Sequence, residues 1–231
     1  MVIGIMDSGI GGLNLLARLL KLKCADRYLY FADTEHLPYG SKGAENLREI
    51  AFRGVERLRE RGANVVIFGC NTLSVCALDA IRKKTSLPLF GLLPRPELTY
   101  GKTLFMTTPT TSLFLPPLAR QSVLLTPPRL APLIDRFYPD TREIARYLSP
   151  LLAPYRDMDC AYLGCSHYLF ATEVIRAALP KAKILENVTP LSALVKAVLP
   201  VRSVKNQNVD FLFSGQNEEP RYAAILSSLL S

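Results

Sequence analysis

The 231-residue sequence has no hydrophobic run long enough to cross a membrane. Its first residues lead directly into a strand-like run and lack the basic segment and cleavage site of a signal peptide. The five cysteines are odd in number, irregularly spaced and without a C-x2-C pair, which argues against a disulfide framework and a structural zinc site. Together these absences predict a cytoplasmic protein whose thiols are free.

The chain also lacks a concentrated patch of positive charge, although its formal net charge is +8. Its lysines and arginines are scattered along helical segments among acidic residues, which is typical of solvated helix surfaces. We therefore expect no nucleic-acid partner and no membrane partner. What the chain does contain is a hydrophobic fraction of 49%, which is ample for a packed core.

Strand-like and helical segments alternate along the chain, which predicts an α/β fold with doubly wound parallel sheets. Strands are expected over residues 2–6, 27–32, 65–68, 87–93, 103–107, 122–125, 159–163, 183–185 and 209–213. Helices are expected over residues 13–22, 43–61, 74–84, 142–152, 168–179, 191–199 and 221–230, with Ser74 as an N-cap. A proline-rich shift in composition begins at Pro94, so we expect one domain over residues 1–96 plus 206–231 and a second over residues 97–205.

Two similar motifs place a cysteine at the end of an apolar strand. One is Val65-Val66-Ile67-Phe68-Gly69-Cys70-Asn71-Thr72, and the other is Cys160-Ala161-Tyr162-Leu163-Gly164-Cys165-Ser166-His167. A helical pattern with Ile-Arg at nearly the same offset follows each motif. Because parallel sheets bind ligands at the carboxyl ends of their strands, the repeat predicts two pseudo-symmetric domains. It also predicts that Cys70 and Cys165 face each other across the cleft between them.

Three turns carry weaker signals. The stretch 7–12, Asp-Ser-Gly-Ile-Gly-Gly, joins a strand to a helix, and residues 108–112 hold the equivalent place in the second half. The Pro38-Tyr39-Gly40-Ser41 loop could offer hydroxyls and amides to a carboxylate, but composition alone favours an ordinary turn with Tyr39 on the surface. Residues 126–132 are expected to form a loop.

Other chemistry for the cysteines is less well supported. Cys24, Cys76 and Cys160 lie in helix-end or apolar contexts and are expected to be small hydrophobic residues. A zinc site would have to combine Cys160 with Cys165, His167 and Cys70, although Cys165 and His167 are only two positions apart. A Cys/His hydrolase needs only one thiol beside an imidazole, and it leaves the second Gly-Cys motif without a role.

Taken together, four motifs resemble those of glutamate racemases, which are cofactor-independent enzymes of the aspartate/glutamate racemase superfamily. The motifs are Ile5-Met6-Asp7-Ser8-Gly9-Ile10-Gly11-Gly12, Asp33-Thr34 with Leu37-Pro38-Tyr39-Gly40, Gly69-Cys70-Asn71-Thr72, and Leu163-Gly164-Cys165-Ser166-His167-Tyr168. They occur in the family order and extend from residue 3 to about residue 170. The resemblance agrees with the two-domain, two-thiol interpretation of the repeat.

The resemblance implies a reaction in which one thiolate removes the α-proton of glutamate and the opposite thiol returns one. Cys165 would act on L-glutamate and Cys70 on D-glutamate, with Asp7 assisting Cys70 and His167 assisting Cys165. Asp33 matches a further acid of the family. No metal or cofactor is implied. The substrate contacts implied are Asp7, Ser8, Tyr39, Gly40, Asn71, Thr72, Ser166 and His167, with Thr108 and Thr111 as additional candidates.

The chain departs from the family pattern at three positions. Ser166 and Leu169 stand where the family usually has Thr and Pro, and Asp135 stands where members have a Glu near the family histidine. The expected function is interconversion of L- and D-glutamate to supply D-glutamate for peptidoglycan. The alternatives are a racemase or epimerase of another acidic amino acid such as aspartate, and a weakened relative that binds an amino acid, a protein or a nucleic acid. The sequence leaves the oligomeric state open, with a homodimer as one option.

Overall fold

The computed structural model describes residues 1–199, 204 and 206–231. Its first sheet has five parallel strands in the order β4-β3-β1-β2-β9. These strands are β1 (Val2–Asp7), β2 (Arg27–Ala32), β3 (Val65–Phe68), β4 (Leu89–Gly91) and β9 (Asn208–Phe213). Since β9 pairs with β2, the end of the chain returns to the first sheet, as the sequence predicted.

Helices cover both faces of this sheet because side chains alternate along its strands. Ile3 and Ile5 of β1 belong to the core that includes α1 (Leu13–Lys21), α8 (Val188–Val198) and α9 (Glu219–Leu230). Met6 faces the opposite way, into the core with α2 (Ala44–Glu60) and α3 (Asn71–Arg82). The first sheet is therefore doubly wound.

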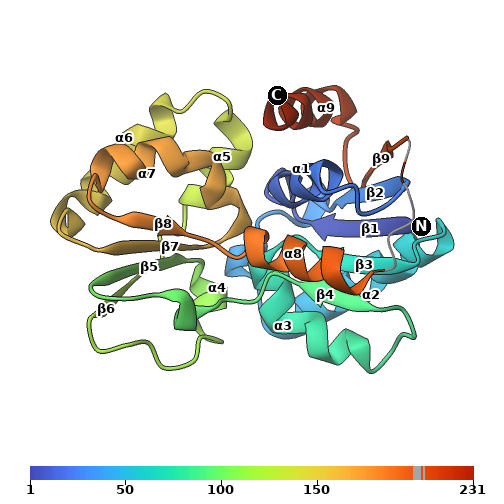
Figure 1. Ribbon diagram of the computed structural model, residues 1–231, viewed down its shortest axis with the longest axis horizontal. Helices are drawn as coiled ribbons and strands as arrows, with labels where there is room; N and C mark the ends of the chain where they lie inside the picture. The colour runs from blue at the N-terminus through green and yellow to red at the C-terminus, as the bar shows by residue number, and fades with distance from the viewer. Residues whose placement is uncertain (200–203, 205) are drawn as a thin grey trace.

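The second sheet has four parallel strands in the order β6-β5-β7-β8. Its strands are β5 (Thr103–Thr107), β6 (Ser122–Leu125), β7 (Cys160–Gly164) and β8 (Lys183–Leu185). Figure 1 shows α5 (Leu130–Phe137), α6 (Arg142–Leu152) and α7 (Thr172–Ala178) on one side of this sheet, beside the layer of α1 and α9. The buried residues of these layers form one continuous core.

The two sheets confirm the predicted α/β class. Each strand of the first sheet lies within residues 1–96 or 206–231, and each strand of the second lies within residues 97–205. Helix α8 comes from the second range but packs against α1 of the first. We propose that the division between the domains follows the strands, with α8 as the element that crosses it.

Several local predictions were wrong. Helix α3 begins at Asn71, directly after its N-cap Cys70, and Ser74 lies inside the helix, where its hydroxyl donates to the Cys70 carbonyl at 2.7 Å. Helix α5 begins within the stretch expected to be a loop, because Pro127 and Pro128 precede the helix and Pro132 lies in its first turn, where a missing N–H costs no hydrogen bond. The helix expected from residue 168 starts instead as a 3-10 turn, η5 (Ser166–Ala171). The turn expected at residues 108–112 contains the short helix α4 (Pro109–Ser112).

The hydrophobic helices of this fold are all short or amphipathic. Within the described ranges, none combines the length and the hydrophobicity that a membrane-spanning helix requires.

Candidate active site

Cys70 lies between the end of β3 and the first residue of α3. The backbone N–H groups of Thr72 and Leu73 donate hydrogen bonds to its thiol. Burial nevertheless raises the pKa of Cys70 well above its ordinary value, and the negative charges of Asp7 and then of Cys165 raise it further. The resting Cys70 is therefore a neutral thiol, which is the form that can donate a proton.

Cys165 occupies the equivalent position after β7, as the duplicated motif predicted. Its thiol is hydrogen-bonded to His167, and the Nε2 atom of His167 lies 3.2 Å from a carboxylate oxygen of Asp135. Burial opposes a charged imidazole, but the hydrogen bonds to Asp135 and Cys165 and the charge of Asp7 outweigh it and raise the pKa of His167 well above its ordinary value. The imidazolium of His167 therefore places a positive charge beside the Cys165 thiol.

Asp135, on helix α5, reaches His167 although it is one methylene shorter than the family residue expected there. The same carboxylate oxygen accepts a hydrogen bond of 2.9 Å from the backbone N–H of Ile10. Burial would raise the pKa of Asp135, but the hydrogen bond and charge of His167, with the Ile10 N–H and the Arg221 charge, hold that pKa below its usual value. Asp135 is therefore an ionised partner of His167.

Asp7 ends strand β1 and is completely buried. Its carboxylate accepts hydrogen bonds of 2.9 Å from the Gly9 N–H and 3.1 Å from the Ser166 hydroxyl. Burial raises the pKa of Asp7, although the charge of His167 and these two hydrogen bonds partly counteract the effect. A carboxyl with a raised pKa next to Cys70 can accept a proton from that thiol and return it.

Three buried threonines join the two sheets on another side of the site. The Thr72 hydroxyl lies 3.0 Å from the hydroxyls of both Thr108 and Thr111, and Thr108 donates to Thr111 at 2.9 Å. Thr72 comes from α3 and the other two from the segment after β5. Such a cluster of hydroxyls can turn its protons toward an incoming carboxylate.

Tyr39 is buried, with 1% of its surface exposed, so the expectation of a surface tyrosine was wrong. Its hydroxyl donates a hydrogen bond of 2.6 Å to Asp33, which also contacts Nδ1 of His36 at 2.9 Å. Burial, followed by the charge of Asp33, raises the pKa of Tyr39 well above its ordinary value. Asp33 thus lies behind Tyr39 and fixes its orientation.

A small cavity lies where these groups meet, with a volume of about 10 Å³. Its walls contain both Cys70 and Cys165, together with Ser8, Leu37, Pro38, Tyr39, Gly40, Thr72, Thr108, Ala131 and His167. This volume holds roughly one water molecule, so an amino acid requires the two sheets to move apart. The sequence therefore predicted both thiols and most of the polar lining.

The other predicted site residues lie behind this lining. Thr111 is hydrogen-bonded to Thr72 and Thr108 of the lining, whereas Asp7 and Ser166 are hydrogen-bonded to each other. Asn71 is 1% exposed, and both its amide nitrogen and its amide oxygen lack a hydrogen-bond partner in the described structure. Leaving such an amide unsatisfied costs about 1–3 kcal/mol, which suits a group reserved for a ligand.

Two aliphatic residues, Leu37 and Ala131, line the cavity although neither was predicted from the sequence to be a site residue. Leu37 comes directly before the Pro38 turn, whereas Ala131 belongs to the unexpected helix α5. Neither residue carries a chemical signal in the sequence, because an aliphatic lining residue looks like any core residue.

The remaining cysteines do not join the site. Cys24, Cys76 and Cys160 are buried, and Cys160 begins the strand whose far end leads to Cys165. In the described part of the chain, no group of three or more His, Cys, Asp or Glu side chains is arranged to hold a metal ion.

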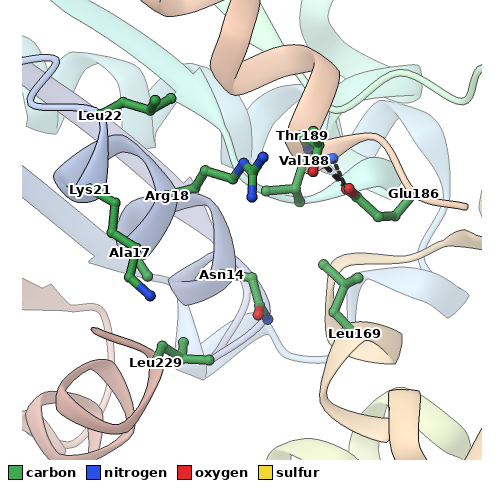
Figure 2. A pocket seen from close by; sticks show the side chains of 10 residues that line it. All are labelled: Asn14, Ala17, Arg18, Lys21, Leu22, Leu169, Glu186, Val188, Thr189 and Leu229. Atoms are coloured by element: carbon green, nitrogen blue, oxygen red, sulfur yellow. Dashed lines mark hydrogen bonds between the residues drawn. The ribbon is translucent and has the colours of Figure 1, made fainter. Parts of the chain in front are cut away.

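A second cavity, of about 410 Å³, lies between α1, the start of α8 and Leu169 of η5 (Figure 2). Asn14 and Arg18 of α1 face Leu169 and Glu186 across it, and the Glu186 carboxylate accepts the Thr189 N–H at 3.0 Å. The lining contains neither a thiol nor an imidazole, so the acid–base chemistry belongs to the smaller cavity.

Comparison with known proteins identifies the family. No family model matches the chain. Glutamate racemase from Leptospira interrogans is 31% identical over 98% of this chain and 91% of its own length. The crystal structures of glutamate racemases from Campylobacter jejuni and, in complex with D-glutamate, from Francisella tularensis have TM-scores of 0.83 and 0.79 at 20% identity. They cover 100% and 99% of this chain and 98% and 92% of their own chains, and at this identity they show the shared fold. The chain belongs to the glutamate racemase family, and it is an amino-acid racemase, an isomerase.

Proposed function

We propose that the protein interconverts L- and D-glutamate by a two-thiol proton transfer that uses no cofactor. One observation carries this proposal: Cys70 and Cys165 line the same cavity, each with its own acid–base partner. Asp7 lies close enough to Cys70 for its charge to raise the pKa of that thiol, and His167 is hydrogen-bonded to Cys165. A racemase of this kind needs one proton-transfer group on each face of the α-carbon.

Racemisation of L-glutamate begins at Cys165. The Cys165 thiolate takes the α-proton, the electron pair of the broken C–H bond stays on the α-carbon, and the Cys70 thiol delivers its own proton to the opposite face. Cys165 ends as a thiol and Cys70 as a thiolate, so the numbers of protons and charges are conserved. From D-glutamate the same steps run in reverse, with Asp7 positioned to accept the thiol proton of Cys70.

The two partners differ in charge, and this difference supports the assignment of roles. His167 places a positive charge beside Cys165, whereas Asp7 places a negative charge near Cys70 and helps to keep that thiol protonated. The resting site is therefore prepared for proton abstraction by Cys165. In the other direction the proton must first move from Cys70 to Asp7, whose raised pKa makes it an adequate acceptor.

The polar lining supports an acidic amino acid as the substrate. Hydroxyls of Ser8 and Thr72, the Asn71 amide and the backbone around Gly40 can hold two carboxylates and an ammonium group. Thr108 and Thr111 lie beside Thr72 and can complete one carboxylate site. Because the closed cavity is too small for glutamate, binding must be coupled to opening and closing of the cleft.

Several broader properties are proposals on the same basis. We infer that the product D-glutamate supplies peptidoglycan synthesis, that the protein acts in the cytoplasm, and that it needs no nucleic-acid partner. A homodimer is compatible with this function. These inferences come from the family resemblance, not from a feature of the site.

Circular dichroism of the purified protein tests the proposed activity directly. The signal of L-glutamate should decay to zero as the racemate forms, with no added cofactor and after exhaustive chelation. L-Aspartate is the competing substrate, and faster decay with aspartate would assign the protein to the alternative. Alkylation of the thiols should abolish activity, and glutamate should protect against it. Substrate binding without any decay would identify a weakened amino-acid-binding relative.

A further inference from the structure

The C-terminal helix α9 reaches the active site through one side chain, Arg221. Its Nη2 atom donates a hydrogen bond to the main-chain carbonyl of Asp135, and its Nη1 atom donates to Glu218 at 2.9 Å. Arg221 belongs to a helix that packs on α1 of the first sheet, whereas Asp135 belongs to α5 beside the second sheet. This contact therefore joins the two halves of the molecule next to the residue that supports His167.

The neighbouring residue anchors α9 to the first sheet. Tyr222 is fully buried, and its ring packs against Tyr30 at 6.0 Å and, edge-on, against Phe213 at 5.0 Å. The Tyr30 hydroxyl in turn donates a hydrogen bond of 2.7 Å to the carbonyl of Gly9. Helix α9 is thus fixed to the same loop that presents the Ile10 N–H to Asp135.

Asp135 is held from three sides at this junction. Ile10 of the first sheet and His167 of η5 both contact its Oδ1 atom, and Arg221 holds its main chain. Resting on the proposed racemase function, we propose that Arg221 is a positioning residue. It keeps the end of α5 against the first sheet so that the Asp135 carboxylate orients the imidazole of His167 toward Cys165. A change of about 1 Å in such an arrangement can cost roughly 10²-fold in rate.

The charged groups around Asp135 predict how the pKa values of Asp135 and His167 should change when Arg221 is removed. The positive groups are His167 from η5 and Arg221 from α9, the negative group is Asp7 at the end of β1, and the phenols of Tyr30 from β2 and Tyr222 from α9 also face Asp135. Without Arg221, Asp135 keeps fewer positive neighbours, so its pKa should rise. His167 should meet a less well-placed carboxylate, so its pKa should fall.

The test compares Arg221→Gln and Arg221→Lys with two matched controls. Glu218→Gln removes the intrahelical partner of Arg221 and leaves the contact with Asp135. Arg176→Gln removes an exposed arginine that pairs with Glu173 in the same i,i+3 arrangement. We expect kcat of Arg221→Gln to fall about tenfold or more with KM nearly unchanged, because the side chain acts on proton transfer and not on binding.

The pH profile separates positioning from simple stabilisation. In Arg221→Gln the acid limb of the plot of kcat against pH should move to higher pH and the basic limb to lower pH, so the active pH range narrows. Arg221→Lys should restore this range in part. Both controls should keep the limbs of the wild type. A uniform loss of activity with unmoved limbs, or an equal loss in the controls, would overturn the proposal.

A titration of His167 by NMR tests the same proposal independently of the activity on glutamate. The chain has two histidines, so His167 can be assigned by comparison with a His36→Gln variant. A lower pKa of His167 in Arg221→Gln supports the positioning role, whereas an unchanged pKa contradicts it. If the wild-type protein failed to racemise glutamate, this titration would still show whether Arg221 acts on His167 through Asp135.

Discussion

Ser166 donates a hydrogen bond of 3.1 Å from its hydroxyl to the carboxylate of Asp7. Ser166 begins η5, directly after Cys165, and Asp7 ends β1 of the first sheet, close enough to Cys70 for its charge to raise the pKa of that thiol. Asp7, the partner of Cys70, is therefore hydrogen-bonded to the residue that follows Cys165. A movement that separates Ser166 from Asp7 would break this bond, so we expect closure of the cleft to be coupled to the hydrogen bonding of Asp7.

The close approach of Gly11 to the second sheet gives a prediction about this coupling. A Cβ atom at Gly11 would lie 2.5 Å from Nδ1 of His167 and 2.5 Å from Oγ of Ser166. Gly11→Ala should therefore displace both side chains and lower kcat by roughly 10²-fold, as expected for a misplaced catalytic group. Steady-state kinetics in both directions measures the effect.

Gly43→Ala is the matched control, because a Cβ atom there meets nothing within 4 Å. It should leave kcat unchanged. Wild-type turnover in Gly11→Ala would show that the cleft does not need to close as tightly during catalysis as it does here.

Asp135→Asn tests the support of His167. The substitution keeps the shape but removes the charge that favours the imidazolium, so the Cys165 thiolate should form less readily. We expect turnover to fall about tenfold or more, and to fall further from L-glutamate than from D-glutamate in initial-rate, single-turnover measurements. An equal effect in both directions, or none, would remove Asp135 from this role.

The raised pKa of His167 predicts how stability changes with pH. A histidine whose folded-state pKa lies above its unfolded value of about 6.5 stabilises the fold fully below that value. The contribution is lost as the pH rises from that value through the folded-state pKa, because over this range unfolding releases a proton that the folded protein still holds.

Urea unfolding of the wild type and of His167→Gln measures this effect. Between pH 7 and 9 the free energy of unfolding of the wild type should decrease with pH more steeply than that of the variant. The thiols that do not contact His167 are present in both proteins, so their ionisation largely cancels in the comparison. Parallel pH dependences would mean that His167 is not held charged in the folded protein.

The sequence predicted the structural features that depend on one sheet alone. The repeated Gly-Cys motif placed Cys70 and Cys165 correctly, because a strand end has the same position in every parallel sheet. The return of β9 to the first sheet and the burial of Cys24 and Cys76 were also predicted. These features follow from local periodicity and composition.

What the sequence could not predict depends on how the two sheets dock. The burial of Tyr39 results from Asp33 behind it and from the second sheet opposite, neither of which is visible in a Pro-Gly turn. The hydrogen bond from Ile10 to Asp135 joins residues far apart in the chain, and Asp135 belongs to a helix whose first turn and approach contain three prolines, a composition typical of a loop. The start of α3 at Asn71 could not be predicted either, because serine is a favoured N-cap residue and Ser74 therefore looked like the start of the helix.

Cys70 and Cys165 line the same cavity. The most direct test of the two-thiol mechanism is therefore an isotope experiment in heavy water. Starting from L-glutamate, the first D-glutamate formed should carry solvent deuterium, whereas L-glutamate recovered at low conversion should carry little. Cys70→Ser and Cys165→Ser should each stop racemisation in both directions, because a hydroxyl is a far weaker acid than a thiol. Exchange at one face could survive in a single variant. Racemisation by Cys70→Ser at near the wild-type rate would contradict the two-thiol mechanism.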